Sequence, residues 1–363
     1  MRAHADATLL ASRAVIAGFD GTSLPDDLAA LLSRGALGGI VLFKRNIESA
    51  AQAAALIDAA RSVSPRGSEP IIAVDQEGGR VARLKEPLAI LPPARSVAAL
   101  DDPGLTREVG RLVGLELAAL GFTLDFAPVL DIDTNPASPV IGDRAFGACA
   151  DTVIRHGLAF ARGLCDGGLL PCAKHFPGHG DAAVDSHLAL PRVELEAERL
   201  RAVEMAPFAA YAEARLGPIM TAHVVYTGLD PDAPATASRA ILTEELRGRI
   251  GFSGAVITDD LEMGAVSHIG GPAAAAVRAL RAGADGLLVC RSREVRGAVV
   301  EAIALEAARD SAFLGRLEEA VSRIDALRIS PARALDPAWV RSAEHAALRD
   351  DIAARLGAVE ARV

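Results

Sequence analysis

The chain has 363 residues, of which 51% are hydrophobic and 23% are charged, and its formal net charge at pH 7 is −9. Such a length accommodates either one large α/β barrel or two ordinary domains. The acidic balance argues against a surface for nucleic acid or anionic membranes, because both require clustered lysine and arginine side chains. There is no apolar run of about 20 residues and no basic, apolar leader, so the sequence predicts a cytoplasmic protein that does not span a membrane.

The cysteines are widely separated and form no C-x-x-C pair. They are Cys149, Cys165, Cys172 and Cys290. This spacing fits reduced thiols in a protein core better than disulfide bonds or a zinc site.

Short apolar or β-branched runs alternate with longer segments of helical periodicity from near the start of the chain. The predicted strands are Val15–Phe19, Gly39–Phe43, Ile71–Val74, Thr123–Phe126, Leu170–Ala173, Pro218–Ala222, Ala255–Thr258 and Gly286–Val289. The predicted amphipathic helices are Leu28–Arg34, Ala50–Arg61, Leu105–Leu120, Thr152–Asp166, Leu195–Arg215 and Ala273–Ala282. Between Val225 and Leu246 we expect a loop, followed by a short helix at Thr243–Ile250.

The order of these elements predicts an α/β fold, a (β/α)8 TIM-type barrel with a C-terminal helical extension. Eight βα units over about 290 residues suit a barrel whose usual size is about 250 residues. A doubly wound sheet would normally carry a glycine-rich phosphate loop after its first strand, and Asp20-Gly21-Thr22 is no such loop. Beyond Cys290 the pattern is helical, with a break at Ser330–Pro337. We expect a single domain over 1–363, with the barrel at about 10–300 and the helices at about 300–363.

The densest polar motif is Lys174-His175-Phe176-Pro177-Gly178-His179-Gly180, which is followed by Asp185-Ser186-His187. It comes directly after the predicted strand Leu170–Ala173. Catalytic and binding groups of such barrels lie at the carboxyl ends of the strands. The ends of four other predicted strands are polar as well, and they carry Asp75, Arg83, Asp131, Arg144, His223, Asp259 and Asp260. The sequence therefore predicts a site at this face of the barrel.

Some of these residues also have a purely structural interpretation. Arg144 could form an ion pair with Asp143 or Asp131, and His223 could bond a neighbouring loop instead of a ligand. Of the adjacent Asp259 and Asp260, one could cap the following helix while the other acts in the site.

The motif Asp185-Ser186-His187 has two interpretations as well. Histidine gains and loses protons near neutral pH, and a carboxylate two residues away can orient its ring. Alternatively, Asp185 bonds only its own backbone in a turn, and His187 is incidental.

Taken together, these segments resemble glycoside hydrolase family 3, in its β-N-acetylglucosaminidase branch of the bacterial peptidoglycan-recycling type. The matching segments span roughly 15 to 290 and include Gly38–Phe43 with Arg45-Asn46, Asp75–Arg83, Pro139–Arg144, Lys174–His187, Met220–His223 and Thr258–Leu261. The histidine run with its trailing Asp-Ser-His is the most specific of them.

The resemblance implies retaining hydrolysis of a terminal, non-reducing β-linked N-acetylglucosamine through a covalent glycosyl-aspartate. It makes Asp259 the nucleophile, His187 the general acid/base and Asp185 its partner. It assigns sugar binding to Asp75, Arg83, Arg144, Lys174 and His175, with no metal and no cofactor. The implied substrates are muropeptides that carry N-acetylglucosaminyl-1,6-anhydro-N-acetylmuramic acid, and we expect a monomer with no nucleic-acid or membrane partner.

Three alternatives remain open from the sequence. A His–Asp pair is less negative than a carboxylate, so phosphate could replace water, which would make the enzyme a phosphorylase. His175, His179, Asp185 and His187 are common metal ligands, so a metallohydrolase is the second alternative, which unchanged activity after exhaustive EDTA treatment would exclude. The third alternative is a barrel that binds sugar without cleaving it.

Overall fold

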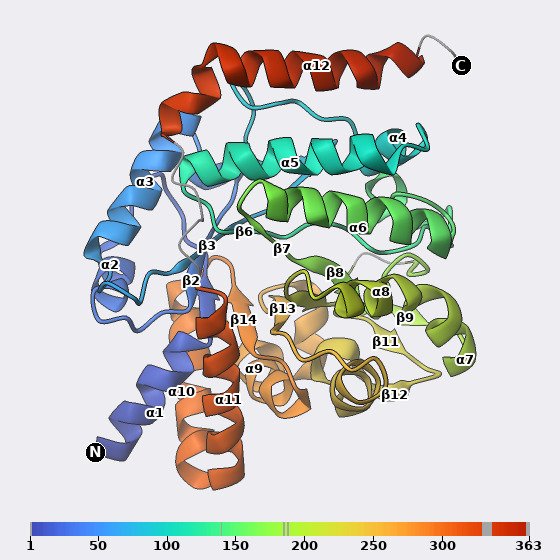
Figure 1. The fold of residues 1–363 in the computed structure, drawn as a ribbon. Coiled ribbons are helices and arrows are strands. Elements are labelled where there is room, and N and C mark those ends of the chain that lie inside the picture. The colour runs from blue at the N-terminus through green and yellow to red at the C-terminus, as the bar shows by residue number, and fades with distance from the viewer. Residues whose placement is uncertain (1, 139, 184–185, 187–188, 329–335, 361–363) are drawn as a thin grey trace.

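The computed structural model describes residues 2–138, 140–183, 186, 189–328 and 336–360. Its main sheet has nine parallel strand segments in the order β7-β6-β3-β2-β1-β14-β13-β10-β8. The two ends of this order, β7 (Leu170–Pro171) and β8 (Ala173–Phe176), are separated only by Cys172, so they act as one interrupted strand. The sheet of the described residues therefore closes into an eight-stranded barrel, and the predicted (β/α)8 fold is confirmed (Figure 1).

Each predicted strand is present, although several are shorter than expected. Besides β7 and β8, the barrel strands are β1 (Val15–Ala17), β2 (Gly39–Leu42), β3 (Ile71–Val74), β6 (Leu124–Asp125), β10 (Ile219–Thr221), β13 (Val256–Asp260) and β14 (Gly286–Val289). Their residues alternate between two hydrophobic clusters, since Ile71 and Ala73 belong to one while Ile72 and Val74 belong to the other. A period of two with both faces buried is typical of a parallel barrel. Ile71 and Ala73 fill the interior, and Ile72 and Val74 pack against the helices.

Helices surround the barrel, as the sequence periodicity predicts (Figure 1). They are α2 (Asp26–Leu32), α3 (Ala50–Val63), α5 (Pro103–Leu120), α6 (Ala150–Asp166), α8 (Ala206–Ala214), the π-helix Ala240–Arg249 and α9 (Gly271–Ala282). The boundaries of α5 have local causes. The Asp102 carboxylate accepts the backbone N–H of Leu105 at 3.0 Å, and the helix ends at Gly121, whose φ is 96°.

The predicted helix Leu195–Arg215 is interrupted. It consists of α7 (Ala197–Arg199), the π-helix Leu200–Glu204 and α8. Pro207 lies in the first turn of α8 and has no backbone N–H to continue the hydrogen-bond ladder from the preceding turn. The single-helix prediction is therefore wrong at this point.

The C-terminal helices are α10 (Arg293–Arg309), α11 (Ser311–Ala326) and α12 (Ala343–Glu360). Of the predicted break Ser330–Pro337, only the last two residues lie within the described part of the chain. Helix α12 runs beside α5 on the outside of the barrel (Figure 1), where the buried His345 ring is 2.7 Å from the Glu116 carboxylate. Because this contact is buried and joins the helical extension to the barrel, we propose that the two form a single domain.

Two further features were not predicted. Helix α1 (Arg2–Arg13) precedes the barrel and packs against α10. The loop predicted after Val225 contains β11 (Val225–Tyr226) and β12 (Asp230–Pro234), and β11 pairs with both β12 and β9 (Arg192–Val193). Within the described residues, no helix combines the length and the apolar character that crossing a membrane requires.

Candidate active site

A cavity of about 200 Å³ lies at the carboxyl ends of the barrel strands. Six predicted site residues line it, namely Asp75, Arg83, Arg144, Lys174, His175 and Asp259. The other two, Asp185 and His187, lie outside the described residues, and Ser186 between them lines the cavity. The structure thus brings together predicted side chains from four different strand ends, namely those of β3, β6, β8 and β13.

Lys174, from β8, is held by two carboxylates. Its Nζ lies 2.7 Å from Asp75 Oδ1 and 2.6 Å from Glu77 Oε1. Burial alone would raise the pKa of Glu77, but Arg144 and Lys174 hold that pKa well below its ordinary value. The Lys174 ammonium is likewise kept charged, because Asp75 and Glu77 raise its pKa despite burial. The cavity wall is therefore a fixed arrangement of opposite charges.

Arg144 pairs with Glu77, and not with Asp143 or Asp131 as the structural interpretation of the sequence suggests. Its Nε and Nη2 each lie 2.8 Å from one oxygen of the Glu77 carboxylate, a two-point contact. Asp143 instead pairs with Arg80 at 3.3 Å. Nη1 of Arg144 also donates to the carbonyl of Val140 at 3.2 Å, so Glu77 and Val140 together orient the Arg144 guanidinium at the cavity.

Glu77 is a residue of the site that the prediction missed. It lies in β4 (Gln76–Gly78), which pairs with β5 (Val81–Ala82) in a hairpin after β3. Asp75 and Glu77 both contact Lys174, whereas the Gln76 side chain accepts the backbone N–H of Arg83 at 2.8 Å. This alternation is the period of two of a strand, and it was the available signal for Glu77.

Replacing Glu77 with glutamine tests how far this pairing positions the site. The amide cannot balance both Lys174 and Arg144, so we expect kcat/KM for a β-N-acetylglucosaminide to fall by about 100-fold, in line with small displacements of binding groups. Steady-state kinetics would measure this, with thermal unfolding to show that the variant is folded. Glu48→Gln changes an exposed glutamate and should leave both unchanged. Equal activity of the two variants would contradict a positioning role for Glu77.

His175, also from β8, is oriented by Asp131, which the sequence analysis placed at a strand end without assigning it a role. Asp131 is 0% exposed. Its Oδ2 accepts a hydrogen bond from Nδ1 of His175 at 2.7 Å. Its Oδ1 accepts hydrogen bonds from the backbone N–H groups of His175 (3.1 Å) and His179 (2.7 Å). Burial alone would raise the pKa of Asp131, but His175 and these contacts hold it below its ordinary value. Because an ionised carboxylate only accepts hydrogen bonds, His175 carries its proton on Nδ1 when neutral.

Asp259 and Asp260, at the end of β13, have different surroundings. Asp260 Oδ1 accepts the backbone N–H groups of Glu262 (3.0 Å) and Cys290 (3.2 Å), and burial raises the pKa of Asp260 to about 6. Asp259 Oδ1 accepts the N–H of Asp260 at 2.8 Å. Burial alone would raise the pKa of Asp259, but His175, the backbone N–H of Asp260 and the Lys174 ammonium hold it below its ordinary value, so the carboxylate is ionised at neutral pH.

His223 bonds a neighbouring loop and does not line the cavity. Its Nε2 lies 3.0 Å from the carbonyl of Asp260, and its Nδ1 lies 2.7 Å from the Thr236 hydroxyl. Burial lowers the pKa of His223, so the ring is neutral and donates from Nε2 to that carbonyl. Nδ1 then accepts from Thr236. His223 therefore fixes the backbone that carries Asp259.

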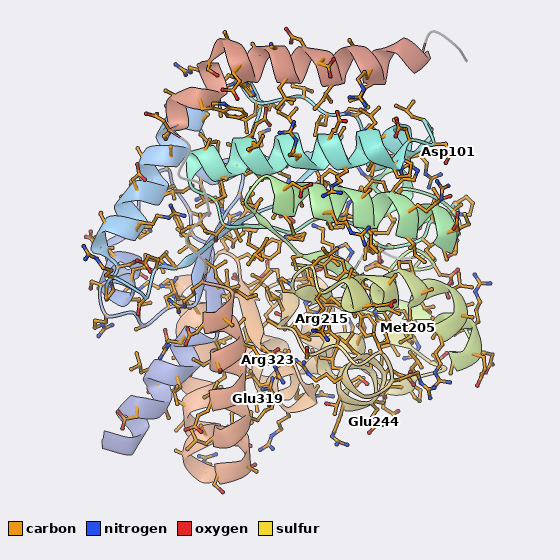
Figure 2. All side chains as sticks on the ribbon, in the orientation of Figure 1. Asp101, Met205, Arg215, Glu244, Glu319 and Arg323 are labelled. Carbon is orange, nitrogen blue, oxygen red and sulfur yellow. The ribbon has the colours of Figure 1, made fainter. Side chains whose placement is uncertain are left out.

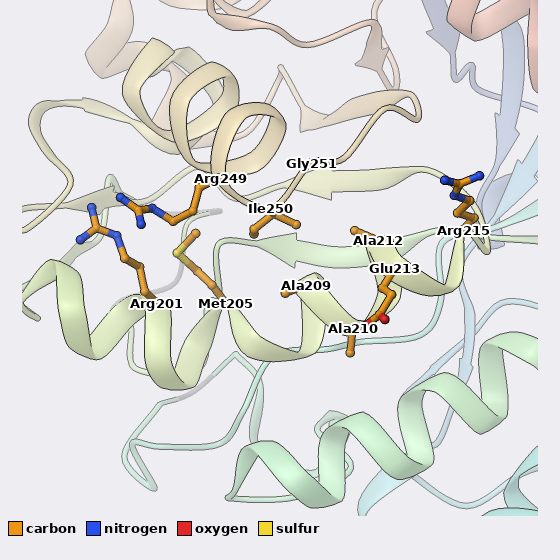
Figure 3. A pocket seen from close by; sticks show the side chains of 10 residues that line it. All are labelled: Arg201, Met205, Ala209, Ala210, Ala212, Glu213, Arg215, Arg249, Ile250 and Gly251. Atoms are coloured by element: carbon orange, nitrogen blue, oxygen red, sulfur yellow. The ribbon is translucent and has the colours of Figure 1, made fainter.

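A larger groove of about 650 Å³ lies elsewhere, on the outside of the barrel (Figure 3). It runs between the helical segment that carries Arg201 and Met205 and the segment Arg249–Gly251. None of the predicted site residues lines it. Among the described residues, no three His, Cys, Asp or Glu side chains are grouped as a metal site requires.

Comparison with known proteins identifies the family of this chain. The model of the glycosyl hydrolase family 3 N-terminal domain matches residues 13–327. A β-hexosaminidase of Alkalilimnicola ehrlichii is 41% identical over 289 residues, which make up 78% of this chain and 82% of that protein.

Solved structures of the same family are similar throughout. A glycoside hydrolase family 3 β-N-acetylglucosaminidase from Paenibacillus sp. has a TM-score of 0.86 at 36% identity, covering 95% of this chain and 68% of that one. NagZ from Neisseria gonorrhoeae, in complex with N-trifluoroacetyl-D-glucosamine, has a TM-score of 0.79 at 32% identity, covering 94% and 96%. The chain therefore belongs to glycosyl hydrolase family 3, and these relatives place it among the β-N-acetylhexosaminidases of that family.

Proposed function

We propose that this enzyme is a retaining glycosidase that removes terminal, non-reducing β-linked N-acetylglucosamine through a covalent intermediate on Asp259. The observation that carries the proposal is the ionised Asp259 carboxylate in a cavity of about 200 Å³ lined with hydroxyl-binding groups. Retention requires one ionised carboxylate to attack the anomeric carbon and one group to protonate the leaving oxygen. Asp259 suits the first of these tasks.

The second task falls to His187, with Asp185 as its partner. A protonated imidazole gives its proton to the leaving oxygen as the glycosyl–Asp259 bond forms. The neutral ring then takes a proton from the water that hydrolyses this bond. Both residues are one peptide unit from Ser186, which lines the cavity, and consecutive Cα atoms are about 3.8 Å apart. Chain connectivity thus supports a place for both near Asp259.

Sugar binding falls to Asp75, Arg83, Arg144, Lys174 and His175. Lysine and arginine donate hydrogen bonds to hydroxyl groups, and Asp75 accepts them. Because Asp75 and Glu77 balance the charges of Lys174 and Arg144, the wall suits a ligand rich in hydroxyl groups and without net charge.

As natural substrates we propose muropeptides from turned-over cell wall, with N-acetylglucosamine linked to 1,6-anhydro-N-acetylmuramic acid. The support is the similarity to NagZ over 94% of this chain together with the site geometry. The sugar of the leaving group would then lie at the mouth of the cavity.

Hydrolysis of 4-nitrophenyl β-N-acetylglucosaminide, followed by proton NMR, tests the proposal. The first product should be the β-anomer of free N-acetylglucosamine, because two displacements at the anomeric carbon restore its configuration. An α-anomer as first product would contradict the covalent intermediate. N-acetylglucosamine 1-phosphate formed in phosphate buffer would identify a phosphorylase, and binding without cleavage would identify a sugar-binding protein.

A further inference from the structure

Ser186 is fixed from two sides of the cavity. Its side chain is 2% exposed, and its Oγ lies 3.2 Å from Nε2 of His179. Its backbone carbonyl accepts the N–H of Ala265 at 3.2 Å, in the 3₁₀-helix Gly264–Ile269 that follows β13. Ser186 is thus bonded both to the segment after β8 and to the segment after the strand that carries Asp259.

His179, which contacts Ser186, is itself held in place by two neighbouring residues. Its backbone N–H donates to Asp131 Oδ1 at 2.7 Å, and its ring packs edge-on against His175 with the centroids 5.7 Å apart. Burial lowers the pKa of His179 to about 4, so the ring is neutral and has one N–H.

The contact between His179 and Ser186 is a hydrogen bond in either tautomer of the neutral ring. With the proton on Nε2 the ring donates to Ser186 Oγ, and with the proton on Nδ1 the Ser186 hydroxyl donates to Nε2. The buried Nδ1 has no hydrogen-bond partner among the described residues.

We propose that Ser186 is a positioning residue for protonation of the leaving group and acts through its contacts with His179 and Ala265. The inference rests on the roles proposed for its sequence neighbours Asp185 and His187. A residue that is bonded through both its side chain and its carbonyl has a fixed position, and small displacements of catalytic groups cost activity.

The basicity of the leaving group provides a way to measure this role of Ser186. A sugar or an alkyl alcohol leaves only when its oxygen is protonated, whereas 2,4-dinitrophenolate leaves without help. Loss of the contact between Ser186 and His179 should therefore slow substrates with basic leaving groups and spare those with acidic ones. A merely structural defect would slow the whole series equally.

The experiment measures kcat/KM for aryl and alkyl β-N-acetylglucosaminides that differ in the pKa of the leaving group. For Ser186→Ala we expect a loss of about 10-fold with an alkyl leaving group, a fraction of the full value of a general acid. With the 2,4-dinitrophenyl substrate, activity should stay within about 2-fold of the wild type. An equal loss across the series, or no loss, would overturn the proposal.

Two further variants isolate the hydroxyl group. Ser186→Thr and Ser186→Val have nearly the same shape, so the threonine variant should retain activity on the alkyl substrate and the valine variant should lose it. Equal activity of the two would overturn the proposal even if Ser186→Ala fails to fold. Ser267→Ala, on the same 3₁₀-helix as Ala265, removes an exposed hydroxyl and is the matched control.

His187→Ala separates this inference from the proposed function. If His187 is the proton donor, that variant should show a steep dependence on the leaving group. A flat dependence for His187→Ala would reject the proposed acid/base. A steep dependence for His187→Ala with a flat one for Ser186→Ala would reject only the role of Ser186.

Discussion

Replacing Asp259 with asparagine is expected to lower kcat for 4-nitrophenyl β-N-acetylglucosaminide by about 10⁴-fold or more, as removal of a nucleophile does in other enzymes that form covalent intermediates. The amide has nearly the shape of the carboxylate and can still accept the N–H of Asp260, so the fold should persist. It cannot attack the anomeric carbon as an ionised oxygen does. Steady-state kinetics and thermal unfolding of the same preparation would measure both effects.

The neighbouring Asp260→Asn is the matched control. Its side-chain oxygen can still accept the backbone N–H groups of Glu262 and Cys290, so we expect nearly full activity. Trapping with a fluorinated N-acetylglucosaminyl donor and peptide mapping should place the label on Asp259. A label on Asp260, or equal losses for the two variants, would reject the assignment of the nucleophile.

The barrel could be predicted because its strands are buried on both faces. A run such as Ile71–Val74 must be apolar throughout, which makes it visible against the amphipathic helices around it. The break at Pro207 was visible as a residue type, but a helical pattern on both sides of it outweighed that signal. The strands β9, β11 and β12 have two to five residues each, too few for a period of two to stand out.

The sequence predicts which residues belong to the candidate site where these residues lie in motifs next to recognisable strands, but it does not predict their pairing. Asp75, Lys174 and Asp259 each follow a recognisable strand, so their shared cavity could be foreseen. Which residue pairs with which depends on contacts across the barrel. Arg144 and Glu77 are 67 residues apart, and His175 and Asp131 are 44 apart, so the spacing within either motif contains no information about these pairs.

At the opposite end of the barrel, Asp285 joins three arginines. It directly precedes β14 and is 0% exposed. One of its oxygens contacts Arg316 and Arg323 of α11, and the other lies 2.7 Å from Arg247 and 2.8 Å from the backbone N–H of Val256. Figure 2 shows Arg323 together with Glu319 on α11. A single buried carboxylate therefore attaches α11 to the base of the barrel.

Replacing Asp285 with asparagine is expected to lower the free energy of unfolding by about 3 kcal/mol, because it leaves three arginines without their buried counter-charge. The catalytic constants at 25 °C should not change, since the active site lies at the other end of the strands. Denaturant unfolding and steady-state kinetics would measure the two quantities. Glu319→Gln is the matched control: this glutamate pairs with Arg316 and Arg323 but is 51% exposed, and such pairs contribute at most about 1 kcal/mol. If both variants lose the same stability, burial of the Asp285 charge is not what attaches α11 to the barrel.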